Sequence, residues 1–102
     1  MSATSQPEIY RAKVNLETSQ IAWKDLQRYF ASGVALAVAA DLDLVEVAYQ
    51  MSRDNAAQIQ RWIAEGKFGK VADEQASVWF YTDALVWAVV ISPWVLVQQV
   101  HQ

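Results

Sequence analysis

The chain has 102 residues, of which 54% are hydrophobic and 12% aromatic, and its formal net charge at pH 7 is −3. This length predicts one domain, and the absence of cysteine excludes disulfides, thiolate metal sites and cysteine nucleophiles. All eight Lys and Arg residues lie in the first 70 residues, so residues 71–102 carry three acidic side chains and no basic one.

The N-terminal third is predicted to be helical after a short disordered tail at 1–5, and residues 6–102 are predicted to form a single domain. Apolar residues recur at helical spacing, and a serine interrupts their row at position 19, which favours two helices, at about 6–17 and 19–32, over one. Gly33 supplies the stop. The start lacks a basic segment followed by an apolar one, so we expect no signal peptide and a cytoplasmic location. The row comprises Ile9, Ala12, Leu16, Trp23, Leu26 and Phe30.

The middle of the chain alternates short strands and helices. Residues 34–40 alternate large and small side chains, which predicts a strand whose alanines let a helix approach closely. Capping signals and apolar stripes predict helices at about 42–52, 55–65 and 73–82, and residues 67–71 form a loop or a short strand.

The uncharged stretch 84–97 is rich in Val, Ile and Trp, which favour strands over helices. Both faces of 84–91 are apolar, so we expect a central strand covered on both sides. Pro93 breaks the stretch, and 94–100 is predicted to return as a neighbouring strand. The uncharged stretch is also too short, at about 14 residues, to span a membrane, which needs about 20. The predicted class is therefore α+β, with about five helices packed in two layers on a small three- or four-stranded sheet.

Three segments resemble a family of small single-domain bacterial proteins of uncharacterised function. They are L-D-L-V-E-V-A at 42–48, W-A-V-V-I-S-P-W-V-L-V-Q at 87–98, and the upstream run E-T-S-Q-I-A-W-K-D-L-Q-R-Y-F-A-S-G at 17–33. The resemblance covers nearly the whole chain and implies a single-domain cytoplasmic protein. It implies no catalytic residues.

The strongest cluster of potential ligands is acidic. Asp41, Asp43 and Glu46 follow a predicted strand and begin a predicted helix, where oxygen ligands can hold a hard cation such as Mg²⁺. The same spacing also caps a helix and complements its dipole, and we favour that interpretation. Asp73 and Glu74 repeat the capping pattern. His101, the only histidine, lies one residue from the end of the chain, so we assign it no chemical role.

Three helices followed by a strand pair also suggest a winged-helix nucleic-acid binder. The third helix would read the bases, yet it begins with two acidic residues and contains no basic one. Because Lys and Arg supply much of the affinity for phosphate, we expect no nucleic-acid binding.

The tryptophans divide into two groups. Trp23 and Trp62 lie on helical stripes and are expected in the core, whereas the aromatic-rich C-terminal third is expected to supply both core and interface. We therefore predict a non-catalytic association module that forms a homodimer or binds an unknown protein, without cofactor or membrane. The alternative is a small-molecule-binding or metal-dependent enzyme that uses the three carboxylates. The interface candidates are Trp79, Trp87, Trp94, Val95 and Val97.

Overall fold

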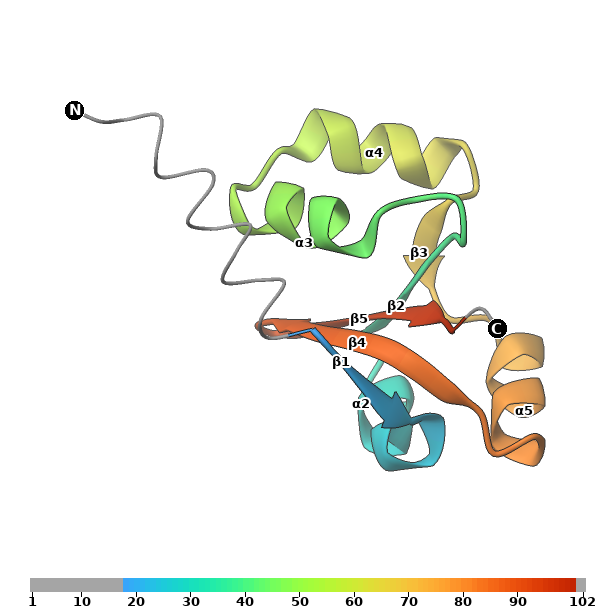
Figure 1. The fold of residues 1–102 in the computed structure, drawn as a ribbon. Helices are drawn as coiled ribbons and strands as arrows, with labels where there is room; N and C mark the ends of the chain where they lie inside the picture. The colour runs from blue at the N-terminus through green and yellow to red at the C-terminus, as the bar shows by residue number, and fades with distance from the viewer. Residues whose placement is uncertain (1–17, 101–102) are drawn as a thin grey trace.

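The computed structural model describes residues 18–100, which form an α+β domain built on a five-stranded sheet (Figure 1). The strand order is β1-β4-β5-β2-β3. Strands β2 and β5 are parallel, and the other three neighbouring pairs are antiparallel. The strands are β1 (Ser19–Ala22), β2 (Ala35–Val38), β3 (Phe68–Lys70), β4 (Leu85–Ile91) and β5 (Trp94–Gln99).

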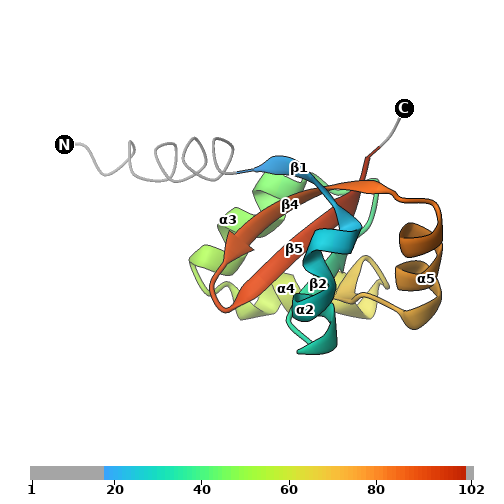
Figure 2. The same cartoon turned by 90° about the horizontal axis from the view of Figure 1, so that it is seen from below.

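Helices cover both faces of this sheet. Helices α3 and α4 lie on one face, here called the α3 face, while η1, α2 and α5 lie on the other, here called the α5 face (Figures 1 and 2). The predicted two-layer arrangement is therefore wrong, although the α+β class is confirmed. The helices are the 3-10 helix η1 (Trp23–Leu26) and the α-helices α2 (Gln27–Ala31), α3 (Leu44–Ser52), α4 (Ala56–Ala64) and α5 (Asp73–Tyr81).

Each face of the sheet carries its own hydrophobic cluster. On the α5 face, Trp23 and Trp79 meet edge to face with their ring centroids 5.1 Å apart. The alanine at position 35 lies beneath them, as the alternation of large and small residues in 34–40 predicts. On the α3 face, Leu36 and Leu96 from neighbouring strands pack under Val47 of α3. The sheet is thus the shared wall of two cores.

The predicted helix at 19–32 begins too early. Residues 19–22 form β1, which pairs with β4 so that Ile21 lies opposite Val86. The hydrogen bond from the backbone nitrogen of Trp23 to the carbonyl of Ala84, 2.9 Å long, continues this connection. Pairing with β4 satisfies backbone groups that a helix would satisfy internally, so a distant partner decides the local structure. Trp23 and Leu26 are still buried, as their helical spacing predicts.

Strand β4 is not the central strand. It is second in the order, and β5 takes the centre because it pairs with β4 on one side and β2 on the other. The predicted hairpin is confirmed, with Ile91 opposite Trp94. Coverage of β4 is incomplete on both faces, since Leu85, Trp87 and Val90 are exposed.

The remaining elements lie close to their predicted positions. Asp43 caps α3 and Asn55 caps α4 through side-chain oxygens, and the weak element at 67–71 is the edge strand β3. The predicted cap at Asp73 is wrong, because Asp73 is the first residue of α5, and the N-cap is Ala72, which makes no side-chain cap bond. The sequence predicts about five helices on three or four strands, whereas residues 18–100 contain four α-helices and five strands. The tail at 1–5, the helix at 6–17 and His101 lie outside the described residues. No helix in the described range is long and apolar enough to cross a membrane.

Truncation of the central strand tests this account of the core. Leu96 is fully buried in the middle of β5, so Leu96→Ala should lower the free energy of unfolding by about 2–5 kcal/mol because it leaves a cavity. Ile63→Ala, at a half-exposed site on α4, is the control and should stay within about 0.5 kcal/mol of the parent. Urea unfolding followed by tryptophan fluorescence measures both, and equal losses would contradict the proposed core.

Candidate functional site

The three acidic residues after β2 are engaged in separate contacts. Asp43 accepts hydrogen bonds from the backbone nitrogens of Val45 and Glu46, at 2.9 and 3.4 Å, and so forms the N-cap of α3. Glu46 accepts a bond of 2.7 Å from the Gln50 amide one turn later. Two of the three carboxylates therefore stabilise α3.

Asp41 pairs instead with Lys67, whose Nζ lies 2.7 Å from its carboxylate. The hydrogen bond from Lys67 lowers the pKa of Asp41, and the same bond raises the pKa of Lys67. The pair links the loop after β2 to the residue before β3, which lie side by side in the sheet. Within residues 18–100, no group of three or more His, Cys, Asp or Glu side chains lies close enough to hold a metal ion.

The side-chain amide of Gln98, on β5, holds the same loop from a neighbouring strand. The amide nitrogen of Gln98 donates to the carbonyls of Ala39 and Leu42, at 2.8 and 2.7 Å. These carbonyls lie between β2 and α3, outside regular structure, and the Ala39 carbonyl also accepts a backbone bond of 3.1 Å from the Leu42 nitrogen. The loop that carries Asp41 and Asp43 is therefore fixed from both sides, by Gln98 and by Lys67.

The structure places the interface candidates unequally. Trp79, Val95 and Val97 are buried in the chain's own core, so in this conformation they cannot present a surface to a partner. Trp94 is half-buried and packs against the cluster on the α3 face. Of the five, only Trp87 is exposed, with an exposed fraction of 36%. Trp79 of α5 and the two valines of β5 face the core of the α5 face, because helices cover both sides of the sheet.

A different set of apolar residues reaches the surface, and we call it the apolar strip: Val78 and Tyr81 of α5 with Leu85 and Trp87 of β4. The first two are one helical turn apart and line a shallow hollow together. Val78 also shares a second hollow with Leu85, and Leu85 and Trp87 project from the same face of β4. The strip therefore runs from α5 through Leu85 to Trp87, on the side of β4 that also carries Val89 of the α3-face cluster.

Sequence reasoning missed three members of the strip, although a signal for part of it was present. Residues 78–81 are four consecutive large apolar or aromatic side chains, more than one face of a helix can bury. Ala76 and Trp79 take the buried face, which leaves Val78, Phe80 and Tyr81 outside. Leu85 carried no such signal, because its exposure depends on which elements cover β4.

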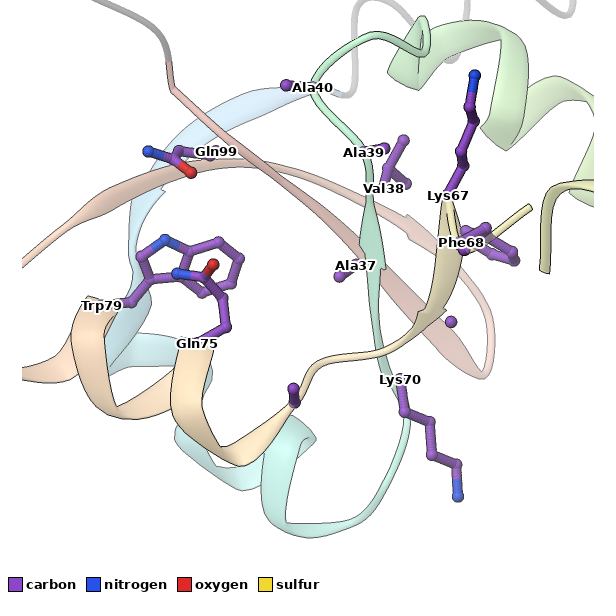
Figure 3. A pocket seen from close by; sticks show the side chains of 13 residues that line it. Ala37, Val38, Ala39, Ala40, Lys67, Phe68, Lys70, Gln75, Trp79 and Gln99 are labelled. Carbon is purple, nitrogen blue, oxygen red and sulfur yellow. The ribbon is translucent and has the colours of Figure 1, made fainter. Parts of the chain in front are cut away.

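A hollow of about 410 Å³ lies on the α5 face between α5 and the β2–β3 pair (Figure 3). Ala37 and the backbone of the two strands line one side, and Gln75 and Trp79 line the other. Lys67 and Lys70 reach its rim but point away from the space in Figure 3. Among the described residues that line it there is no carboxylate, histidine or serine. The hollow offers amide groups beside the ring of Trp79, whose indole nitrogen is buried, and the described lining holds no constellation suited to catalysis.

Comparison with known proteins identifies a family and a solved structure with a similar fold. The family model described as "Protein of unknown function (DUF2288)" matches residues 9–99. The chain belongs to this family. The resemblance at 42–48 and 87–98 is thereby confirmed.

The structure of this family member resembles the NMR solution structure of PA1075 from Pseudomonas aeruginosa. The two chains are 37% identical, with a TM-score of 0.81, and the alignment covers 100% of this chain and 94% of that one. None of the curated proteins matches the chain significantly.

Loss of the α3 cap gives a prediction for the acidic cluster. Asp43→Ala should destabilise the fold by about 0.5–2 kcal/mol, because the backbone nitrogens of the first turn lose their acceptor. Asp43→Asn retains a side-chain oxygen and should cost much less. Chemical unfolding measures both variants, and equal losses would show that charge, rather than the cap, matters at this position.

The Asp41–Lys67 pair gives a pH prediction. The pKa of Asp41 is lowered in the folded state, so the pair contributes stability above the unfolded pKa, about 4, and loses it as pH falls through the folded pKa. Wild type should therefore have a larger free energy of unfolding than Lys67→Met at neutral pH. This difference should vanish in acid. Lys24→Met, which breaks the longer pair with Asp83 at 3.7 Å, is the control. A difference that grows in acid would contradict the assignment.

Proposed function

We propose that this protein is a non-catalytic cytoplasmic association module that forms a homodimer through the apolar strip. The observation that carries the proposal is the strip itself, an uncharged run of large side chains that the described part of the chain leaves uncovered. Its exposed fractions are 55% at Val78, 83% at Tyr81, 51% at Leu85 and 36% at Trp87. Contiguous exposed apolar surface on a small domain is typical of association sites.

The composition of the strip suits an interface. Tyr and Trp are enriched where proteins meet, and they cluster near the centre of the energetically important contacts. Removal of apolar surface from water supplies about 25 cal/mol per Å², which favours covering four such neighbours at once. Leu85 and Trp87, at alternate positions of a strand, form a rigid platform for this contact.

The charge pattern favours a second copy as the partner. The strip contains no charge, so two copies can face each other across a two-fold axis without buried ionic repulsion. Only acidic residues flank it in sequence, since residues 71–102 carry Asp73, Glu74 and Asp83 and no cation. Lys24, from η1, lies 3.7 Å from Asp83 and partly offsets this charge.

Disruption of the strip tests the homodimer. Wild type should elute with twice the chain mass at micromolar concentration, and Leu85→Ser should weaken association about tenfold or more because it removes a central apolar contact. Val90→Ser is the matched control, since Val90 lies on the same strand, is 61% exposed and points to the opposite face. Size-exclusion chromatography with light scattering measures the mass of each. A monomeric wild type at about 100 μM, or equal effects of the two variants, would refute the proposal.

Salt dependence gives an independent prediction. Because the strip is apolar and the charges that flank it in sequence are acidic, with Asp83 only partly offset by Lys24, raising the salt concentration from about 0.05 M to about 0.5 M should strengthen the dimer by screening repulsion between Asp83 and its symmetry mate. Sedimentation equilibrium at both salt concentrations measures the dissociation constant. Weaker association in high salt would instead indicate an interface built on ion pairs.

A further inference from the structure

An apolar groove of about 690 Å³ opens on the α3 face, away from the apolar strip. It lies between α4, the end of α3, the edge strand β3 and the turn that joins β4 to β5. Leu36 and Phe68 contribute apolar surface from the sheet, and Ile59 and Ile63 contribute it from one stripe of α4. The other large apolar residues that line it are Met51, Ile91 and Trp94.

The groove is open although its lining is apolar. Phe68 and Leu36 are buried beneath it, but Ile63 is 51% exposed at its edge. A volume of this size falls within the range of sites that bind small molecules, which are mostly apolar with a few polar groups that orient the ligand. Several segments of the chain contribute to the lining, which makes the open groove concave rather than flat.

The charged groups at the groove define the chemistry that it would recognise. The side chain of Lys70, at the end of β3, is exposed and forms no ion pair or side-chain hydrogen bond with the rest of residues 18–100. Its Nζ lies 3.7 Å from where a Cβ would stand on Gly33, just outside the groove lining. Lys67, by contrast, is already neutralised by Asp41. One acidic residue, Asp54, also lines the groove. Among the described residues that line the groove, Lys70 is the one cation and Asp54 the one anion, so a carboxylate on an apolar body would pair with Lys70 and avoid Asp54.

We propose that this groove binds a monocarboxylate with an extended apolar chain, such as a medium-chain alkanoate free in solution. The chain packs against the isoleucines of α4 and the ring of Phe68, and the carboxylate pairs with Lys70. Asp54 disfavours a second negative charge on the ligand, which selects monocarboxylates over dicarboxylates. This site is independent of the homodimer, because it shares no residue with the apolar strip.

Three probes of equal chain length test the charge requirement: octanoate, octylamine and octanol. Titration into ¹⁵N-labelled protein should shift the backbone amides of Ile63, Gly69 and Ser92 with octanoate, and octylamine and octanol should bind at least about fivefold more weakly. Octanol binding as tightly as octanoate would overturn the role of Lys70. Unshifted amides at these positions with millimolar octanoate would overturn the site itself.

Two variants with opposite expected signs sharpen the test. Lys70→Met should raise the dissociation constant of octanoate about fivefold, and Asp54→Asn should lower it about twofold, because each changes one charge beside the carboxylate. Asn tolerates the positive φ of 60° at position 54, so the backbone is retained. Lys24→Met, at a distant cation, is the control and should leave the constant unchanged.

The outcomes also separate this site from the homodimer. Leu85→Ser should leave octanoate binding intact even where it abolishes the dimer. If Lys70→Met changes the molar mass in light scattering while octanoate does not bind, the groove is occupied by a second copy and the ligand proposal is wrong. If both single-charge variants bind octanoate as wild type does, electrostatic recognition by Lys70 is refuted.

Discussion

The fold depends on the burial of β5 between two neighbouring strands and two helical layers. Three consecutive residues of this strand, Val95, Leu96 and Val97, are each at most 3% exposed. Their side chains alternate between faces, so Leu96 enters the core under α3 while the two valines enter the core under α5. A strand buried in this way needs apolar cover on both sides, and that need accounts for the positions of η1, α3, α4 and α5.

The helices cover the sheet less completely toward both of its edges, and the candidate sites lie at these edges. At the β1 edge, Leu85 and Trp87 of β4 lie opposite Ala22 and Gln20, and the described helices do not reach over them. At the β3 edge, α4 and the sheet diverge enough to leave an apolar groove. A domain of about 100 residues has little material with which to cover a five-stranded sheet, so exposed apolar surface at its margins follows from its size.

Polar side chains near the sheet stabilise the connections between elements. Gln98 satisfies two loop carbonyls, Asp43 caps α3, and Lys67 pairs with Asp41 across the start of the same loop. These contacts account for the acidic cluster without invoking a bound ion. Membership in a family described as being of unknown function leaves the inference about function to the surface. The informative features there are the uncharged strip and the groove with Lys70, which has no side-chain partner within residues 18–100.

The sequence by itself determined most local structure. Capping residues located the starts of α3 and α4, and helical spacing located α5 within a few residues. The alternation in 34–40 located β2 with its alanines toward a helix. It also assigned Asp43 to a cap, because that role depends on neighbours within one turn, and Trp23 to the core, because its apolar spacing marks the buried side whatever element it packs against.

Tertiary structure alone decided the strand character of β1, the central place of β5 and the identity of the exposed apolar residues. Residues 19–22 become a strand because β4, more than 60 residues away in sequence, offers an open edge. Val95 and Leu85 are equally apolar in sequence, yet one lies in the core and the other at the surface. The difference depends on which elements cover each face, and that is set by pairing between segments distant in sequence, which local patterns do not encode.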